Sequence, residues 1–467
     1  MNPSRLRDLP SVGQLAERDD VGALAEKFPR AHVISALRAA LDAVRAQLSK
    51  ADDSEDLPSP EAIVEQAARQ LKIKATPGVR KAINATGVVL HTGLGRAILS
   101  ASARRALGGM DGYSIVQLDV ETGERSLREA RIQTILQELT GVEAATIVNN
   151  NAAATLVVLN TVAKGRDVIV SRGQLVEIGG SFRIPDVMKQ SGARLVEVGT
   201  TNRTHLRDYE KAITEETAAL LHVHTSNYRV QGFTKTVPVE ELVPLGKKYN
   251  LPVIDDIGSG ALIDLSRFGF STEPLVADSV RAGVDLMTFS ADKLVGGPQG
   301  GIILGSEEWV KKIRKSSLTR ALRVCKLTLS ALEATLREFQ DEEGLVRNHP
   351  IMRLFSIPPS TLKRRAGRFA RAINKAVPHV DATIEEGAGR IGSGSLPLEE
   401  IPTWLVALRS DKIEVGRLAA ALRRQDPPVF TRVHDERLLL DLRTILSIDE
   451  ERTITKSLKN ILEKGDS

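Results

Sequence analysis

The chain has 467 residues, of which 42% are hydrophobic and 26% are charged. Single domains usually hold about 100 to 250 residues, so this length predicts one large core with smaller units attached. The 64 basic and 59 acidic side chains leave a formal net charge of +5, which permits an anionic partner without requiring one. A single cysteine, Cys325, excludes an internal disulfide and a multi-cysteine metal site within one chain.

Signals of export, membrane insertion and metal binding are missing from the sequence. Met1 to Gln14 carries scattered charges, and no uninterrupted apolar stretch reaches the roughly 18 residues that a membrane helix needs. The eight histidines are dispersed and form no HExxH-like pair. We therefore expect a cytoplasmic protein with no membrane association and no metal.

Residues 1–75 form the first predicted unit, a helical domain. Apolar side chains recur at helical spacing in residues 33–48 and again in residues 63–71, which predicts two amphipathic helices. The charged, proline- and serine-containing residues 51–60 predict a loop between them. With 11 basic and 12 acidic residues in this unit, binding to RNA would need a localised basic face.

Residues 76–335 form the second predicted unit, a large α/β domain. Short β-branched runs alternate there with helical segments. Near-continuous apolar strands separated by helices indicate a mostly parallel sheet that is covered on both faces. The predicted strands are residues 145–148, 168–171, 195–198, 218–223, 252–256, 286–290 and 301–304.

Residues 336–467 form the third predicted unit, a small α+β domain. A helix predicted over residues 327–340 leads into it. Alternating apolar residues at 437–442 predict a strand, and residues 448–463 predict a final helix.

The candidate site residues follow the predicted strands, because ligands of open α/β sheets bind at the carboxyl ends of the strands. One strand ends at Val148, and a helix follows it. The backbone N–H groups of Asn151, Ala152 and Ala153 at such a helix start can bind a phosphate, which the helix dipole also favours. An ordinary asparagine-capped helix is the alternative interpretation.

Asp255 and Asp256 end a second predicted strand. A carboxylate there can pair with a protonated pyridine nitrogen, and the protonated ring is what makes pyridoxal phosphate an electron sink. Strand alternation turns only one of the two into the site, and we choose Asp256, which directly precedes Ile257-Gly258-Ser259-Gly260. A helix cap or a surface turn is the alternative.

Lys293 follows a third predicted strand and precedes a glycine-rich stretch, residues 296–301. A lysine in this frame suits a Schiff base with the aldehyde of pyridoxal phosphate, and Ser290 can reach the cofactor phosphate. An exposed loop lysine is the alternative, which the rigid glycine frame disfavours.

Residues 222–228 end a fourth predicted strand, where Asn227 can hydrogen-bond the phenolic oxygen of the cofactor. We interpret the nearby His222 and His224 as hydrogen-bonded packing residues. The order along the chain, phosphate helix, then Asn, Asp and Lys, is that of the fold-type I pyridoxal-phosphate enzymes.

Long stretches of the sequence resemble the bacterial selenocysteine synthases, the L-seryl-tRNA(Sec) selenium transferase family. The resemblance extends over nearly the whole chain, and matches of this length arise by chance far less often than a short motif. The stretches are residues 83–96, 148–154, 171–185, 198–205, 292–299, 320–323 and 391–397.

The resemblance implies a fold-type I pyridoxal-phosphate transferase that converts seryl-tRNA(Sec) to selenocysteinyl-tRNA(Sec) with selenophosphate as the selenium donor. It assigns Arg96, Arg320 and Arg323 to the selenophosphate site. Asp292 lines the same pocket and joins Lys293 and Asp256 as a catalytic residue. Without the resemblance, Arg320 and Arg323 would be interpreted as the solvated face of a basic helix.

The resemblance also implies that residues 1–75 bind tRNA and that the chain forms homo-oligomers assembled from dimers, a decamer in the family. The sequence departs from the family at two places: Ala291 stands where the family often has glycine, and residues 123–128 replace a GRG-type segment. The second departure puts local loop contacts in doubt, and neither removes the cofactor chemistry.

Two alternative functions stay open, a pyridoxal-phosphate lyase or transferase of a small amino acid and a non-catalytic tRNA-binding paralogue. A cysteine desulfurase is disfavoured, because Cys325 lies in a predicted helix and is interpreted as a buried small hydrophobe.

Overall fold

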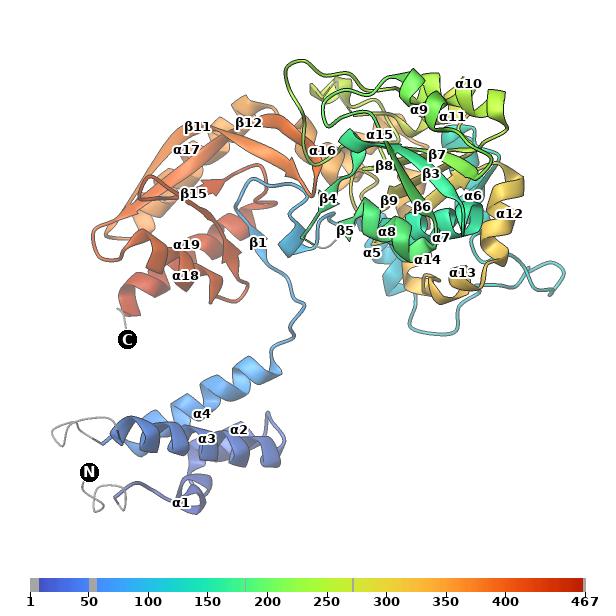
Figure 1. Cartoon of the computed structure of the whole chain (residues 1–467). Coiled ribbons are helices and arrows are strands. Elements are labelled where there is room, and N and C mark those ends of the chain that lie inside the picture. The colour runs from blue at the N-terminus through green and yellow to red at the C-terminus, as the bar shows by residue number, and fades with distance from the viewer. Residues whose placement is uncertain (1–7, 50–56, 181, 271–272, 465–467) are drawn as a thin grey trace. The chain divides into compact units, whose positions relative to one another are not determined.

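Two units make up the chain in the computed structural model, Met1–Lys81 and Ala82–Ser467 (Figure 1). The structure describes residues 8–49, 57–180, 182–270 and 273–464. Within that part of the chain, no helix combines the length and the apolar character needed to cross a membrane.

The first unit consists of helices α1 (Val12–Ala16), α2 (Asp19–Ala25), α3 (Arg30–Leu48) and α4 (Pro60–Ala75). The two predicted helices are confirmed as α3 and α4, whose apolar faces bury Leu37, Leu41 and Ile63 completely. Periodicity alone missed α1 and α2, because each is too short to show a helical repeat. Most of the predicted loop at 51–60 lies outside the described residues.

A seven-stranded sheet dominates the second unit, in the order β2-β10-β9-β8-β7-β3-β6. β10 runs antiparallel to both of its neighbours, β2 and β9, and the other four adjacent pairs are parallel, so the sheet is mostly parallel, as predicted. All seven predicted strands are confirmed: β2 (Ala144–Val148), β3 (Asp167–Ser171), β6 (Arg194–Val198), β7 (Thr217–Val223), β8 (Val253–Gly258), β9 (Leu286–Ser290) and β10 (Gly301–Gly305).

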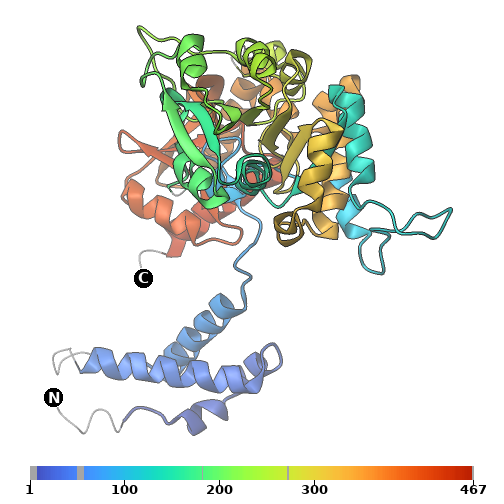
Figure 2. The same ribbon diagram turned by 45° about the vertical axis from the view of Figure 1, so that its right-hand side comes forward.

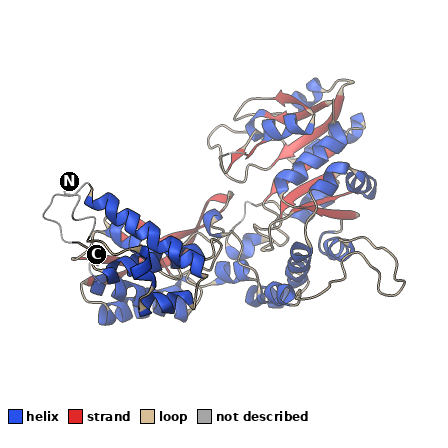
Figure 3. Cartoon of the chain, turned by 90° about the horizontal axis from the view of Figure 1, so that it is seen from below, coloured by secondary structure: helices blue, strands red, loops and turns tan. Residues whose placement is uncertain are grey.

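Both faces of this sheet are buried, because alternate residues of one strand enter different cores. Ile302 and Leu304 of β10 join one apolar cluster, whereas Ile303 joins another. Helices lie on both sides of the strands (Figures 2 and 3). They are α6 (Ala130–Thr140), α7 (Asn151–Ala163), α8 (Ile184–Ser191), α9 (Leu206–Ala212), α10 (Val239–Tyr249), α11 (Val276–Ala282), α12 (Glu307–Lys315) and α14 (Lys326–Glu338).

The C-terminal part of this unit is built on a four-stranded antiparallel sheet, β11-β12-β15-β14. The predicted strand and final helix are confirmed as β15 (Arg437–Asp441) and α19 (Ile448–Lys464). The other elements there are α16 (Pro350–Ser356), α17 (Pro359–Ala376), β11 (Val380–Gly392), β12 (Ser395–Ser410), α18 (Val415–Arg423), β13 (Val429–Phe430) and β14 (Arg432–His434).

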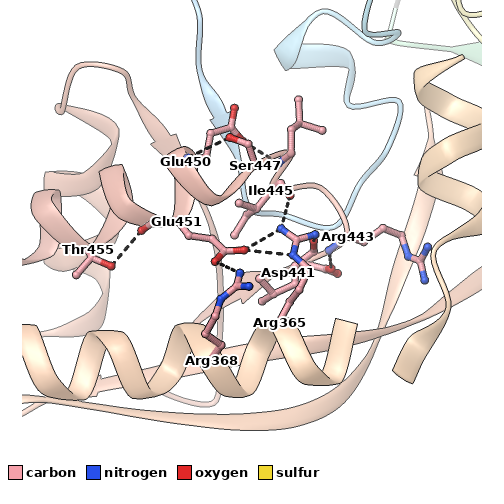
Figure 4. A network of polar contacts seen from close by, with 11 residues as sticks. Arg365, Arg368, Asp441, Arg443, Ile445, Ser447, Glu450, Glu451 and Thr455 are labelled. Atoms are coloured by element: carbon pink, nitrogen blue, oxygen red, sulfur yellow. Dashed lines mark hydrogen bonds and ion pairs between the residues drawn. The ribbon is translucent and has the colours of Figure 1, made fainter. Parts of the chain in front are cut away.

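Two ion pairs of the buried Glu451 join α17 to α19 (Figure 4). The side chain of Glu451 accepts hydrogen bonds from Arg365, at 2.9 Å, and from Arg368, at 2.6 Å. Arg365 also donates to the carbonyl oxygens of Leu442 and Ile445. The carboxylate therefore compensates two guanidinium groups, and Arg365 in turn fixes the turn that leads from β15 into the last helix.

Early residues of the second unit pair with its C-terminal part. β1 (Ile83–Asn84) runs parallel to β13, and the Leu90 N–H donates to the Ile391 carbonyl oxygen. The chain thus crosses the antiparallel sheet before it reaches the large one. The remaining elements are η2 (Thr92–Leu94), α5 (Ala101–Gly108), η3 (Arg172–Gln174), β4 (Glu177–Ile178), β5 (Phe182–Arg183), η4 (Leu265–Phe268), α13 (Ser317–Ala321) and α15 (Glu342–Asn348).

Candidate active site

The carboxyl ends of β2, β9, β8 and β7 meet at one edge of the large sheet. The strand register shows this directly, because Gly301 of β10 pairs with both Val148 and Ser290. Asp256 in turn pairs with Thr288 on β9 and with Val223 on β7. The strand-end residues singled out in the sequence therefore lie at the same edge of the sheet, with β10 between β2 and β9.

Lys293 lies directly beyond β9 and is only 6% exposed. Backbone hydrogen bonds fold the chain tightly around it, from Gly296 N–H to the Lys293 carbonyl oxygen and from Gly297 N–H to the Ala291 carbonyl oxygen. Gly296 has a φ of +75°, and a Cβ there would lie 2.3 Å from Nε2 of His349, so only glycine fits. The loop thus holds the lysine in place by its own backbone.

The surroundings of Lys293 favour its neutral form. Burial lowers the pKa of its ammonium group, and the positive charge of Arg96 lowers it further. The carboxylates of Asp256, Asp292 and Glu273 oppose this shift. A neutral amine is the form that attacks an aldehyde and that accepts a proton.

Asp256 lies on β8, and its buried side chain contacts α7 and is close enough to Lys293 to interact with its charge. Its carboxylate accepts a hydrogen bond from Asn151 Nδ2 at 2.9 Å and another from Thr155 Oγ1 at 3.0 Å. Burial raises the pKa of this carboxyl group, and the two hydrogen bonds oppose the shift. Asp255 points to the opposite side, where it contacts His222 at 2.7 Å and Ser279 at 2.7 Å. Of the two aspartates, only Asp256 can reach a ligand beside Lys293.

The start of α7 offers unpaired donors at this edge. Asn150 caps the helix through its side chain, which accepts the Ala153 N–H at 2.9 Å. Among the described groups, the N–H groups of Asn151 and Ala152 have no hydrogen-bond partner. A Cβ on Gly301 would lie 2.1 Å from the Asn150 carbonyl oxygen, so glycine allows β10 to approach the helix start closely. Two of the three predicted phosphate donors are thus free, and Ala153 is already engaged.

Ser290 and Asn227 flank this group of residues. Ser290 is buried at the last position of β9. Asn227 donates from Nδ2 to the Glu177 carbonyl oxygen at 2.8 Å, and its Oδ1 is buried without a partner among the described groups. Nδ2 carries two N–H groups, so the second one stays available for the phenolic-oxygen contact predicted for Asn227.

Arg96 enters the site from a tight turn that follows η2. Its backbone is left-handed, with a φ of 60°, which costs a non-glycine residue about 1 kcal/mol or more. Its Nη1 lies 2.8 Å from the Asp292 carboxylate, next to Lys293. The structure thus brings Arg96 to Asp292 and Lys293, although Arg96 precedes Asp292 by 196 residues in the sequence.

Arg320 and Arg323 lie on a separate, exposed segment. Arg320 is in α13, Arg323 follows the end of that helix, and both are exposed. The Leu322 carbonyl oxygen between them accepts the Asn149 N–H at 3.0 Å, so the segment is attached to the carboxyl end of β2. No contact of the described residues joins either arginine to Arg96 or Asp292. The basic segment that carries Arg320 and Arg323 is not one helix, because α12 ends at Lys315 and α13 begins only after Ser316.

The interpretation of Cys325 was wrong. Cys325 is exposed and occupies the N-cap of α14 rather than the helix interior. Ser, Thr, Asp and Asn are the usual N-cap residues, so a cysteine at this position does not indicate in the sequence that a helix begins here. Hydrogen bonds from Thr328 lower the pKa of the thiol.

The sequence reasoning missed Glu273 and Ser259. Glu273 has a side chain that is 1% exposed, and it accepts a short hydrogen bond from Ser259. Its other oxygen lies 3.8 Å from Nε2 of His224. Glu273 follows no predicted strand, so the rule of looking at strand ends could not find it.

The residues at this edge of the sheet fit pyridoxal phosphate. Free N–H groups at a helix start and the Ser290 hydroxyl suit its phosphate, a buried carboxylate suits its ring nitrogen, and a buried lysine suits its aldehyde. Buried side-chain oxygens without partners also gather here: Oδ1 of Asn151, Oγ of Ser226 and Oδ1 of Asn227. Buried polar atoms are normally paired, so their grouping at one edge is expected of a ligand site. Among the described residues, no group of His, Cys, Asp and Glu is arranged to hold a metal ion.

This sheet order with a buried lysine and aspartate at the strand ends defines the class of fold-type I pyridoxal-phosphate enzymes. Among solved structures, D-glucosaminate-6-phosphate ammonia-lyase has the same fold, with a TM-score of 0.57, 21% identity and coverage of 85% of this chain and 98% of its own.

The comparisons by sequence are more specific. The family model described as SelA, L-seryl-tRNA selenium transferase, matches residues 82–446. Proteins named L-seryl-tRNA(Sec) selenium transferase from Alkaliphilus metalliredigens and Geobacter sulfurreducens are each 46% identical to this chain, over 96% of it and 97% of their own length. The chain therefore belongs to the L-seryl-tRNA selenium transferase family, which confirms the resemblance and the fold class predicted from the sequence.

Proposed function

We propose that this protein converts L-seryl-tRNA(Sec) to L-selenocysteinyl-tRNA(Sec) with selenophosphate as the selenium donor. The observation that carries the proposal is the buried pair of Lys293 and Asp256 at one sheet edge, in a chain whose relatives bear that name over nearly their full length. The reaction replaces the β-hydroxyl group of the seryl residue by selenium.

Lys293 and Asp256 have separate roles in this proposal. Pyridoxal phosphate supplies an electron sink for the electrons released at the seryl Cα. Asp256 keeps a proton on the ring nitrogen of the cofactor, and Asn151 and Thr155 hold its carboxylate in place. Lys293 would hold the cofactor through its aldehyde, and the neutral form of its amine would be able to accept the Cα proton.

The phosphate of the cofactor is assigned to the helix start of α7. The free N–H groups of Asn151 and Ala152 would donate to it, together with the hydroxyl of Ser290. Ala153 contributes through its small side chain, which leaves room at the helix start. Asn227 would donate its second amide N–H to the phenolic oxygen while the first stays bonded to the Glu177 carbonyl oxygen.

Selenophosphate is assigned to Arg96, Arg320 and Arg323. A planar guanidinium group binds phosphate oxygens in a bidentate manner, which favours arginine for this anion. Arg96 is already held by Asp292 beside Lys293. Arg320 and Arg323 are exposed, and their attachment to Asn149 keeps them near the end of β2, where they are available to bind an incoming anion.

The finer assignments concern the partners and the compartment. We assign tRNA binding to the helical residues 1–75, and we propose a cytoplasmic homo-oligomer assembled from dimers. A loop that projects from the second unit exposes four large apolar side chains, which suits a contact with another copy of the chain (Figure 2). They are Tyr113, Ile115, Leu118 and Val120.

The first experiment asks whether Lys293 carries pyridoxal phosphate. The purified protein incubated with the cofactor should show a visible absorbance band, and borohydride should fix the cofactor on Lys293. Lys293→Ala should lose both, whereas the exposed Lys311→Ala should keep both. A borohydride-stable adduct that persists in Lys293→Ala would contradict the assignment.

A further inference from the structure

Glu273 is a buried acidic residue near Lys293 that has no role in the proposed reaction. Its side chain is 1% exposed, although carboxylates are rarely buried without a cationic partner. Among the described residues, no lysine or arginine forms an ion pair with it, and the nearest basic group is His224 at 3.8 Å. A burial of this kind needs a physical reason.

The backbone explains how Glu273 reaches the site. Ala261 and Leu275 form a parallel bridge, and the Val276 N–H donates to the Ala261 carbonyl oxygen at 3.0 Å. Ser259 lies two residues before Ala261, and Glu273 lies two residues before Leu275. The parallel register of the bridge therefore places Glu273 beside Ser259. The Ser259 hydroxyl donates to the Glu273 carboxylate.

Ser259 connects this carboxylate to the lysine loop. The Ser259 carbonyl oxygen accepts the N–H of Leu294, the residue after Lys293, at 3.3 Å. His224 approaches from the other side, and its own N–H donates to the Asp256 carbonyl oxygen at 2.9 Å. Glu273 is therefore held between the two segments that carry Lys293 and Asp256.

The other acidic groups near Lys293 are already engaged. Asp256 accepts hydrogen bonds from Asn151 and Thr155, and Asp292 forms an ion pair with Arg96 at 2.8 Å. Glu273 accepts only from a hydroxyl group and faces the imidazole of His224. Glu273 thus has one hydrogen-bond donor where Asp256 has two, and it lacks the guanidinium partner that Asp292 has.

We propose that Glu273 is a positioning residue of the active site, whose buried carboxylate, held by Ser259 and His224, stabilises the protonated form of the Lys293 nitrogen when the cofactor is bound. The charged groups that face this nitrogen are Arg96, Asp256, Asp292 and Glu273, with His224 behind the last of these. Arg96 opposes protonation and the carboxylates favour it. The inference rests on the proposed binding of pyridoxal phosphate to Lys293.

The test is a pH titration of the visible absorbance band in the cofactor-loaded protein without substrate. The band reports the protonated nitrogen of the Lys293 linkage. Removing a nearby anion destabilises this form, so Glu273→Gln should move the midpoint to lower pH by about one unit. Glu273→Asp, which keeps the charge, should restore most of the shift.

Two further variants keep the test decisive if Glu273→Gln folds poorly. Ser259→Ala removes the donor that stabilises the charged carboxylate, so its midpoint should move in the same direction by a smaller amount. Asp255→Asn is the matched control. It removes the carboxylate that pairs with His222, and this carboxylate is also buried but lies on the side of β8 opposite to Asp256. Its midpoint should stay unchanged.

The outcomes separate this inference from the proposed function. An unmodified protein that develops no band would overturn both. A band whose midpoint is the same in Glu273→Gln and Ser259→Ala as in the unmodified protein would overturn the role of Glu273 alone. An equal shift in Asp255→Asn would do so too, because the effect would then not be specific to Glu273.

Discussion

His349 should make the stability of this protein depend on pH, although it lies outside the active site. The side chain is fully buried at the N-cap of α16. Its Nε2 donates to the Val295 carbonyl oxygen at 3.0 Å, in the loop that follows Lys293, and its Nδ1 accepts the Met352 N–H at 3.4 Å. A proton on Nδ1 would remove this acceptor, so the fold requires the neutral ring.

Burial lowers the pKa of His349 from 6.5 to about 4. In the unfolded chain the ring takes up its proton below about pH 6.5, whereas in the folded protein it does so only near pH 4. The unfolded state therefore binds more protons in this interval, and stability is lost as the pH falls from 6.5 towards 4. A difference of about 2.5 pKa units corresponds to about 3 kcal/mol.

The assay is urea unfolding at several pH values between 6.5 and 4, followed by the fluorescence of Trp309 and Trp404. His349→Gln keeps a donor for Val295 and does not titrate. It should be less stable than the unmodified protein at neutral pH, and this difference should shrink by up to about 3 kcal/mol across the interval. The exposed His434→Gln is the control, and its difference should stay constant. Parallel stability curves for His349→Gln and the unmodified protein would refute the reasoning.

Three other predictions concern single side chains. Glu451→Ala removes a buried carboxylate that pairs with the part-buried Arg365 and the exposed Arg368, and it should destabilise the protein by roughly 2 kcal/mol in urea unfolding. Asp449→Ala, which breaks an exposed pair, should cost less than about 1 kcal/mol, and equal losses would contradict the ion-pair analysis. Arg320→Ala should weaken thiophosphate binding, as a stand-in for selenophosphate, roughly ten- to hundredfold at saturating seryl-tRNA, and unaltered affinity would remove Arg320 from the anion site. Hydrogen bonds from Thr328 lower the pKa of the Cys325 thiol, so iodoacetamide should alkylate Cys325 at a lower pH than it alkylates free cysteine. In Thr328→Val the pH profile of alkylation should move back towards that of free cysteine. Identical profiles for the unmodified protein and Thr328→Val would argue against this effect.

The apolar strands of the large sheet could be predicted from the sequence because both faces are buried. Residues such as Ile302, Ile303 and Leu304 are apolar without interruption, and that pattern identifies a strand. The same pattern does not record direction, so the antiparallel course of β10 could not be predicted. The hairpin of β11 and β12 was missed because its residues mix glycine, proline and glutamate with apolar side chains.

The candidate site, too, contains residues that the sequence predicted and residues that it could not predict. Asn151, Asp256 and Lys293 follow strands closely, so the rule for parallel sheets predicted that they lie together. Glu273 reaches them through a bridge to Ala261 that depends on tertiary structure. The resemblance to the family singled out Arg320 and Arg323. The sequence could not predict that both side chains are exposed or where the helix around them ends, because tertiary packing determines both. The exposure of Cys325 could not be predicted for the same reason.

The most direct test of the account is a turnover measurement on the cofactor-loaded protein with selenophosphate. Seryl-tRNA(Sec), another seryl-tRNA and free serine should be compared as substrates, with Lys293→Ala as the inactive control. The account predicts selenocysteinyl-tRNA from seryl-tRNA(Sec) alone and no product from Lys293→Ala. Conversion of free serine with no activity on seryl-tRNA(Sec) would contradict it and would indicate an enzyme of a small amino acid instead.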